Sequence, residues 1–252
     1  MRRMLLCVLT VVSSAPVCAP AQSIGAFPND VQHYGEIADP SVWPISAVGV
    51  VTIGLFSRVM YCTGTLVAPK LVLTAAHCLF NGELLVNPGN VKFLAGLNKG
   101  VPTAHADAKR LVVPAEFLPG PPTPELVIND WALIVLRDPF ATKPISVRPT
   151  TRDEFRTNVD PASTMQIGYG RDRRYLPSIV RGCSVDESQD GRLFNHNCLV
   201  NFGFSGAPIL AQIDGSIVVV AINSVGNPER RTGMACSATQ FAKVIAQLAQ
   251  SE

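Results

Sequence analysis

The chain has 252 residues, a length that suits one or two domains, with 47% hydrophobic residues, 16% charged residues and a formal net charge of +2. This composition supplies ample apolar material for a sizeable core and excludes an intrinsically disordered chain. No basic stretch is long enough for a nucleic-acid footprint, so we expect no nucleic-acid partner.

The N-terminal segment has the pattern of a secretory signal peptide, predicted to end at residue 21. Arg2 and Arg3 form a basic start, Met4–Val12 is almost entirely apolar, and Ala19–Ala21 matches an Ala-x-Ala cleavage site. The apolar run is too short for a stable membrane anchor, so we expect a periplasmic or secreted protein. Lipid modification of Cys18 is an alternative, although the residues before it fit a lipoprotein signal poorly.

Residues 22–44 contain three prolines and lack strong periodicity, which indicates an irregular arm or a pro-segment. From there on, short runs rich in Val, Ile and Leu alternate with Gly, Pro and Asn clusters, as in an all-β sandwich or barrel. The expected strands are Ala47–Leu55, Cys62–Ala68, Leu71–Thr74, Val91–Leu94, Leu111–Val113, Trp131–Leu136, Met165–Gly168, Ile179–Val185, Cys198–Val200, Pro208–Ala211 and Ile217–Ile222.

Other segments are expected to be loops or helix. Pro114–Pro124 is dense in proline and should be a loop, whereas the polar residues 148–161 could join two halves. Near the C-terminus, an apolar stripe at i, i+3, i+4 and i+7 predicts a helix that Ser237 or Thr239 could cap. The stripe consists of Phe241, Val244, Ile245 and Leu248.

The stretch Leu73–Cys78 carries the first chemical feature, a histidine that follows an apolar strand and small residues. Small residues allow a tight turn and leave the imidazole of His77 facing a cleft. A disulfide between Cys78 and Cys62 of the preceding strand would fix this turn. Closing a loop of that length contributes about 3 kcal/mol in the chain-entropy picture.

Two further features complete the chemistry. Asp130 opens the apolar stretch Trp131–Leu136, so its charge would be partly buried and would need a partner, such as the Nδ1–H of a histidine. Gly203 and Gly206 lie on either side of Ser205 and allow a tight turn with positive φ. That turn can expose the Ser205 hydroxyl and direct the N–H groups of Gly203 and Ser205 into one pocket as an oxyanion hole.

Each feature has an ordinary explanation when it stands alone. A histidine beside a cysteine is often structural, an Asp that opens a strand is often a cap, and Gly-x-Ser-Gly is common in loops. The order of His77, Asp130 and Ser205, the apolar strands that carry them and the exported context together predict a catalytic triad.

These motifs resemble those of the trypsin-like serine proteases, which share the His, Asp, Ser order. The resemblance covers the chain from about residue 47 to the C-terminal helix, and residues 168–170 resemble the family's Gly-aromatic-Gly stretch. The matching motifs are Thr74–Cys78, Asp130 before Trp131–Leu133, and Gly203–Pro208.

The resemblance implies two six-stranded antiparallel β-barrels, with a catalytic cleft between them. His77 and Asp130 would come from the first barrel and Ser205 from the second. Ser205 would attack a peptide carbonyl and form an acyl-enzyme, with His77 as general base and then general acid. We therefore expect a protease domain over residues 45–252, whose two barrels meet near residues 148–161.

The chain departs from the animal digestive enzymes of the family directly before the nucleophile. Those enzymes carry an Asp that pairs with a new N-terminus after zymogen cleavage, whereas this chain has Phe204. No Ile-Val-Gly-Gly sequence begins the first strand either, so we expect no such activation switch. The chain is more similar to bacterial branches that resemble glutamyl endopeptidases.

The resemblance also implies the substrate pocket. Leu199 stands about where trypsin has the Asp that binds Arg or Lys, and Asn223 stands where glutamate-specific relatives carry a histidine. We therefore expect a preference for small or apolar side chains, with Ser224–Gly226 binding an extended peptide backbone. The implied substrate-binding residues are Leu199, Val200, Asn223, Ser224, Val225 and Gly226.

Five cysteines remain after signal removal, and they should pair in an oxidising compartment where geometry permits. Cys183 and Cys198 flank the loop that leads to Ser205 and would form a second disulfide. Cys236 would then stay unpaired, as a small buried apolar residue. No Cys-x-x-Cys spacing is present, so we expect no structural zinc site. We also expect no cofactor.

The sequence thus predicts an exported serine endopeptidase that acts on peptides or proteins. One alternative is a catalytically impaired pseudo-protease that binds peptides or proteins through the same cleft, with Phe204 as the reason to consider it. Another is an esterase that uses the same triad. The sequence indicates no oligomeric state.

Overall fold

The computed structural model describes residues 35–55, 58–188 and 190–252. The predicted signal peptide and the larger part of the predicted arm lie outside these residues. Within the described part of the arm, β1 (Glu36–Ile37) pairs in antiparallel fashion with β11 (Ser178–Arg181). Within the described ranges, no helix has the length and apolar character needed to cross a membrane.

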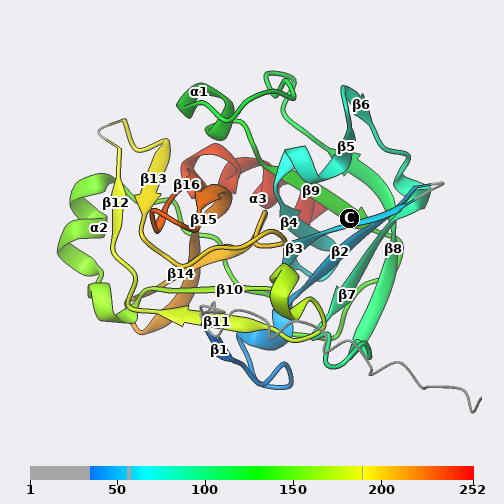
Figure 1. Cartoon of the computed structure of the whole chain (residues 1–252), viewed down its shortest axis with the longest axis horizontal. Coiled ribbons are helices and arrows are strands. Elements are labelled where there is room, and N and C mark those ends of the chain that lie inside the picture. The colour runs from blue at the N-terminus through cyan, green and yellow to red at the C-terminus, as the bar shows by residue number, and fades with distance from the viewer. Residues whose placement is uncertain (1–34, 56–57, 189) are drawn as a thin grey trace, which may run out of the picture. The chain divides into compact units, whose positions relative to one another are not determined.

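The first half of the fold is a closed barrel of six antiparallel strands, in the order β2-β3-β4-β9-β8-β7 (Figure 1). A short hairpin of β5 (Phe80–Asn81) and β6 (Leu84–Leu85) lies beside it. β4 and β9 are buried along their whole length, which is why they appear in the sequence as continuous apolar runs. The barrel strands are β2 (Val48–Leu55), β3 (Arg58–Ala68), β4 (Leu71–Thr74), β7 (Val91–Ala95), β8 (Ala104–Val112) and β9 (Ala132–Leu136).

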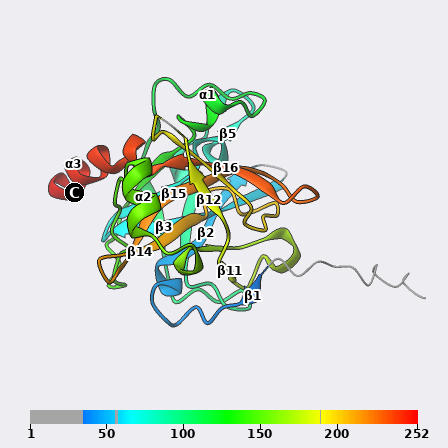
Figure 2. The same cartoon turned by 90° about the vertical axis from the view of Figure 1, so that its left-hand side faces the viewer.

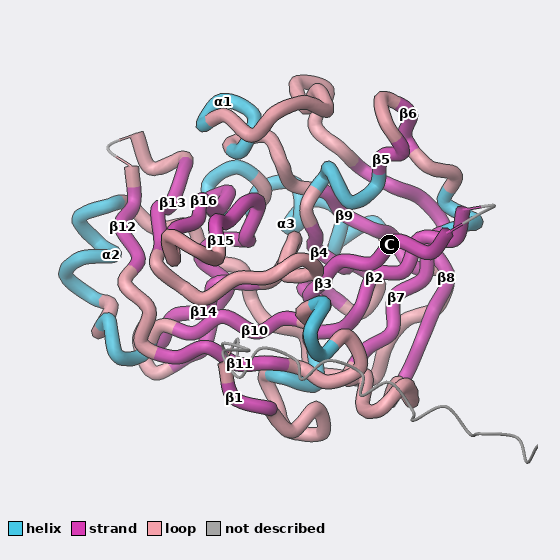
Figure 3. Tube along the Cα trace, viewed as in Figure 1, coloured by secondary structure: helices cyan, strands magenta, loops and turns pink. Residues whose placement is uncertain are grey.

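The second half is an antiparallel sheet of eight strands, in the order β1-β11-β10-β14-β15-β16-β13-β12 (Figure 3). The expected all-β fold of two halves is confirmed, with one refinement: the second half is an open half-barrel sheet, whereas the first is closed. Its remaining strands are β10 (Met165–Gly168), β12 (Val185–Glu187), β13 (Leu193–His196), β14 (Pro208–Ile213), β15 (Ser216–Asn227) and β16 (Thr232–Ser237).

Three α-helices occur in the described part of the chain: α1 (Pro124–Val127), α2 (Arg152–Asn158) and α3 (Ala242–Ser251). α3 is the predicted C-terminal helix, and it contacts β3 and β4 of the barrel. Ser237 caps the short 3₁₀ turn Ala238–Gln240 before it and not α3 itself. α2 covers the second sheet (Figure 2), where Phe155 packs edge-on against Phe194 with ring centroids 5.1 Å apart.

Some expected elements are wrong or were missed. Cys198–Val200 is a loop, and the strand in this region is β13, a few residues earlier. β16 was not expected, and the single strand predicted over Ile179–Val185 is divided between β11 and β12. The segment 148–161 contains α2, whose complete capping box of Thr151 and Glu154 is a helix signal visible in the sequence.

Candidate active site

His77 lies in the 3₁₀ turn Ala76–Leu79, directly after β4 and the fully buried Ala75. Its Nδ1 atom is 2.7 Å from Oδ2 of Asp130. Its backbone N–H donates a hydrogen bond of 2.8 Å to Oδ1 of the same carboxylate. One residue therefore engages both oxygens of Asp130, which orients the imidazole relative to the barrel.

Asp130 is fully buried next to β9 and has a further donor from the second sheet. The hydroxyl of Ser224 donates a hydrogen bond to Oδ2. Burial raises the pKa of Asp130, but the charge of His77 and the hydrogen bonds from His77 and Ser224 outweigh it and lower the pKa below its ordinary value. The carboxylate is thus kept ionised beside the imidazole.

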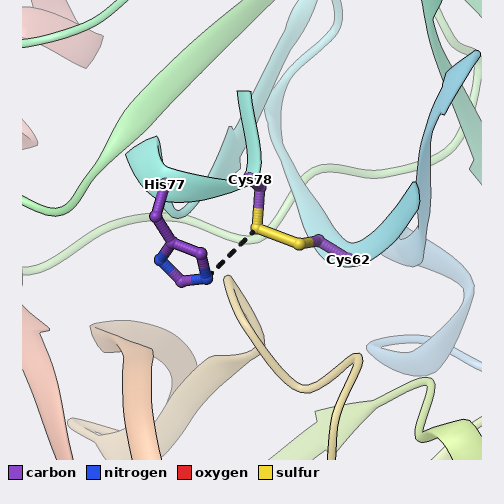
Figure 4. Close-up of side chains that lie close together, drawn as sticks. All are labelled: Cys62, His77 and Cys78. Atoms are coloured by element: carbon purple, nitrogen blue, oxygen red, sulfur yellow. Dashed lines mark hydrogen bonds between the residues drawn. A yellow bond between two sulfur atoms is a disulfide. The ribbon is translucent and has the colours of Figure 1, made fainter. Parts of the chain in front are cut away.

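Burial and Asp130 also act in opposite directions on the pKa of His77. Burial lowers its pKa, but the charge of Asp130 and the hydrogen bond to it outweigh burial and raise the pKa above the ordinary 6.5. Because Nδ1–H is used by the carboxylate, the neutral ring has its lone pair on Nε2. Nε2 lies 3.8 Å from the Sγ atom of Cys78 (Figure 4), and within the described ranges no hydrogen bond joins it to Ser205.

The structure contains both expected disulfides, Cys62–Cys78 and Cys183–Cys198, and Cys236 is a buried free thiol. The potential ligand atoms of Cys62, Cys78 and His77 lie within 4.8 Å of one another. Figure 4 shows that the two sulfur atoms are joined to each other. Since a metal ion needs thiolates, this grouping offers no metal site while the disulfide is intact.

Ser205 lies in the turn between β13 and β14, flanked by Gly203 with φ +98° and Gly206 with φ +77°. A Cβ atom at Gly203 would collide with the carbonyl oxygen of Tyr169, and one at Gly206 with that of Thr63. Both positions therefore require glycine. In the described part of the chain, the N–H groups of Gly203 and Ser205 make no hydrogen bond, so both donors remain available to a ligand.

Thr63 of β3 connects this turn to the first barrel, and no sequence motif marked it. Its N–H donates to the carbonyl of Ser205 at 2.9 Å, and its hydroxyl donates to the carbonyl of Gly203 at 2.8 Å. The same hydroxyl accepts from the N–H of Tyr169 at 3.0 Å. The carbonyl of Thr63 accepts from the Thr74 hydroxyl at 2.8 Å, so the residue has partners in both halves.

The side chain of Phe204 is fully buried and does not line the cleft. It packs with Val200 and Ala207. A Cβ atom at Gly168 would lie 2.7 Å from the Phe204 ring, and one at Gly170 would lie 3.0 Å from it. The ring thus occupies the space that two glycines leave, and it lies behind the turn instead of beside the Ser205 hydroxyl.

His77, Asp130 and Ser205 line one cleft of about 510 Å³. The first half contributes apolar side chains to the lining, and β15 contributes residues 223–226. Sequence reasoning missed these apolar side chains, which come largely from the proline-rich loop before α1. They include Phe80, Phe117, Pro119, Pro122 and Leu126.

Five of the six expected substrate-binding residues line this cleft: Val200, Asn223, Ser224, Val225 and Gly226. Leu199 does not, because it lines a separate pocket beside Ile179 and Arg231. Consecutive residues of an extended segment point to opposite sides, so Val200 faces the cleft and Leu199 faces away from it. The expectation for Leu199 is corrected accordingly.

The neutral residues Val200, Asn223 and Gly226 of the cleft lining are held by close contacts. A Cβ atom at Gly226 would collide with the side chain of Val200. The amide of Asn223 donates to the carbonyl of Phe204 at 3.2 Å and accepts at 2.9 Å from Nε2 of His196. Burial lowers the pKa of His196 to about 4, so its ring is neutral and its Nε2–H donates to Asn223.

The backbone of β15 has an unpaired edge beside Ser205. β14 pairs with β15 only as far as Ile222, whereas β16 pairs with the other side of β15 up to Asn227. Within the part of the chain that the structure describes, residues 224–226 therefore present a free edge to the cleft. An extended peptide can add to such an edge as a further strand.

Comparisons with known proteins agree with this architecture. The sequence model of a family described as trypsin-like peptidase domain matches residues 62–222, which is more than half of the chain. Serine protease 23 of Bos taurus is 31% identical over an alignment of 176 residues, and the match covers 60% of this chain and 44% of that protein. Serine protease 23 of Rattus norvegicus is 30% identical over an alignment of 177 residues, and the match covers 60% of this chain and 43% of that protein.

A solved structure of a Glu endopeptidase in complex with MPD has a similar fold. The TM-score is 0.66 at 21% identity, and the match covers 86% of this chain and 95% of that one. At this identity the similarity concerns the fold alone. The chain spans less than half the length of the two curated relatives.

Proposed function

Because this chain belongs to the trypsin-like peptidase family, we propose that it is an exported serine endopeptidase that cleaves peptides or proteins through Ser205, His77 and Asp130. The observation that carries this proposal is the buried Asp130 carboxylate, which holds His77 in one tautomer in the cleft that Ser205 shares. A carboxylate and an imidazole arranged in this way form the base of a serine nucleophile.

In the proposed reaction, the substrate adds to the free edge of β15 and places its scissile carbonyl beside Ser205. Oγ of Ser205 attacks the carbonyl carbon while Nε2 of His77 takes the hydroxyl proton. The resulting imidazolium is stabilised by Asp130, and the N–H groups of Gly203 and Ser205 stabilise the oxyanion.

The second stage reverses the proton transfer. His77 passes its proton to the leaving amine, the peptide bond breaks, and the acyl group stays on Ser205 as an ester. His77 then deprotonates a water molecule that attacks this ester, and the proton returns to Ser205 when the acid product leaves.

The walls of the cleft support a preference for small or apolar side chains before the scissile bond. Its lining contains Phe80, Phe117, Leu126 and Val200. Among the described residues, its only ionisable side chains are His77 and Asp130, which already pair with each other. An Arg, Lys or Glu side chain would find no opposite charge there.

Two observations support export. The N-terminal sequence has the signal-peptide pattern. Two disulfides join cysteines within the folded domain, and such bonds persist in oxidising compartments. We therefore propose that the protein acts in the periplasm or outside the cell.

A fluorophosphonate probe tests the nucleophile in protein that begins at Gln22. We expect one covalent adduct on Ser205 by peptide mass spectrometry, and none in Ser205→Ala. Ser216→Ala is the matched control, because Ser216 is an exposed serine in the β14–β15 hairpin and does not line the cleft. Folded protein that takes up no probe would contradict the proposal and would favour the pseudo-protease.

A digest of a mixed peptide library tests the reaction class. We expect internal peptide bonds to be cut, with small or apolar residues before the cleaved bond. Cleavage of p-nitrophenyl esters with no cleavage of any peptide would instead favour an esterase.

A further inference from the structure

A group of basic and aromatic side chains, all exposed except the half-buried Tyr61, lies beside the nucleophile turn, and the proposed chemistry does not use it. We call it the basic rim; it consists of Tyr61, Arg171, Arg174, Tyr175 and Phe202. The guanidinium of Arg171 lies 5.5 Å from the ring centroid of Phe202, and that of Arg174 lies 4.6 Å from the ring of Tyr175. Phe202 is 73% exposed although it is a large apolar side chain.

The charge of the basic rim is not neutralised within the described chain. The nearest carboxylate in sequence, Asp172, is held by Arg173 at 3.3 Å and by the amide of Asn201 at 3.0 Å. No ion pair in the described ranges involves Arg171 or Arg174. Two guanidinium groups on aromatic faces therefore remain open to an anionic ligand.

Contacts connect the basic rim to the nucleophile turn. Phe202 lies three residues before Ser205 and also lines the cleft, and its carbonyl accepts a hydrogen bond of 2.7 Å from the N–H of Arg171. Tyr61 packs so closely that its ring would be 2.8 Å from a Cβ atom at Gly203. Burial raises the pKa of Tyr61, and the positive charges of Arg174 and Arg171 act in the opposite direction.

The orientation of the site decides which part of a substrate would meet this rim. In the proposed reaction, the residues before the scissile bond pair with the free edge of β15 at 224–226. The leaving amine must lie near Nε2 of His77, which gives it a proton. Nε2 faces the disulfide of Cys78 and Cys62 (Figure 4), and Cys62 is the neighbour of Tyr61 on β3. We place the basic rim on the leaving-group side, because Tyr61 belongs to the same stretch of β3 as this disulfide.

The reach of the substrate can be estimated from chain geometry. The Cα atom of Phe202 is at most about 11 Å from that of Ser205, because consecutive Cα atoms are 3.8 Å apart. An extended peptide advances about 3.3 Å per residue. The second to fourth residues after the scissile bond thus come within side-chain reach of the rim.

We propose that the basic rim selects substrates that carry Asp or Glu at the second to fourth residue after the scissile bond. This inference rests on the proposed peptidase function and adds a specificity that the neutral cleft cannot provide. The rim residues Arg171 and Arg174 would pair with the substrate carboxylates, while Tyr61 and Phe202 would contact the methylene groups beside them. The residues before the scissile bond would still be chosen by the apolar cleft.

The test compares kcat/KM for three quenched-fluorescence peptides of one sequence, with Glu, Gln or Lys at the third residue after the cleaved bond. We expect the Glu peptide to exceed the Gln peptide by about three- to tenfold, and the Lys peptide to be cut most slowly. The ratio should fall towards one as ionic strength rises, because exposed charges are screened.

Variants assign the effect to the rim. In Arg171→Gln/Arg174→Gln, the Glu-to-Gln ratio should fall to about one. In the control Arg137→Gln, which removes an exposed arginine at the end of β9, the ratio should stay unchanged. A ratio that persists in the double variant would overturn the assignment to these arginines.

The outcomes also separate this inference from the function on which it rests. If the unsubstituted protein reacts with fluorophosphonate and cleaves all three peptides equally, the inference is wrong and the peptidase function stands. If it neither reacts nor cleaves any peptide, the proposed function fails and the inference fails with it.

Discussion

The hydroxyl of Ser224 and the Nδ1–H of His77 donate hydrogen bonds to the same oxygen of Asp130, Oδ2. Ser224 belongs to the second sheet, whereas His77 and Asp130 belong to the first barrel. The charge partner of the imidazole is therefore positioned from both halves of the fold. Ser224 therefore influences the proposed general base His77 through Asp130, and it also belongs to the free edge of β15 where we propose that the substrate binds.

Replacing Ser224 with Ala should lower kcat/KM about tenfold, because a hydrogen bond to a buried charge is lost. With one donor fewer, Asp130 attracts the imidazolium proton more strongly, so the pKa of His77 should rise. The acid limb of the pH–kcat/KM profile should then move to higher pH. Ser216→Ala serves as control, and a profile that keeps its midpoint in Ser224→Ala would contradict the proposed role.

The pH dependence of the unsubstituted protein follows from the raised pKa of His77. Only neutral His77 can accept the Ser205 proton, so kcat/KM should fall as the pH drops through that pKa. The midpoint of the acid limb should lie above the ordinary histidine value of 6.5. Measured with a peptide that lacks ionisable side chains, a midpoint below 6.5 would show that Asp130 does not act on His77 as the structure indicates.

Two neighbouring phenylalanines should respond very differently to replacement by Ala. Phe204→Ala removes a fully buried ring and should lower the free energy of unfolding by about 3–5 kcal/mol. Phe202→Ala removes an exposed ring and should change it by less than about 0.5 kcal/mol. Urea unfolding in a Ser205→Ala background, which prevents self-digestion, measures both. Equal effects would mean that Phe204 is not the core residue described here.

The second disulfide should stabilise the fold. Replacing both Cys183 and Cys198 with Ser opens a loop with a sequence separation of 15 and should lower the free energy of unfolding by about 3 kcal/mol. Cys236→Ala, which leaves both disulfides in place, is the control. A thiol assay in denaturant should find one reactive thiol in protein that begins at Gln22, and none in Cys236→Ala. A count of three or more would mean that a disulfide is absent.

Local sequence patterns predicted the parts of the molecule whose structure depends mainly on residues that are close together in the sequence. The apolar runs of β4 and β9 and the stripe of α3 were recognisable in this way, as were the glycines around Ser205. Because the pairs Cys62–Cys78 and Cys183–Cys198 are close in sequence, their bridging was also predictable.

Contacts between distant segments were not predictable. The bond from Ser224 to Asp130 spans 94 positions, and that from Thr63 to Gly203 spans 140. No local pattern of either segment contains such a contact. Leu199 and Val200 were both expected at the cleft, because the direction of each side chain depends on how the loop before Ser205 turns.

The hydrogen bonds of Thr63 couple the unfolding of the two halves. Its backbone and hydroxyl hold the carbonyls of Ser205 and Gly203, and its own carbonyl is held by Thr74 in the wall of the barrel. If either half unfolds, the nucleophile turn loses its hydrogen bonds to Thr63. We therefore expect that no partly unfolded form retains activity. Loss of cleavage and loss of structure on heating should therefore follow a single cooperative transition.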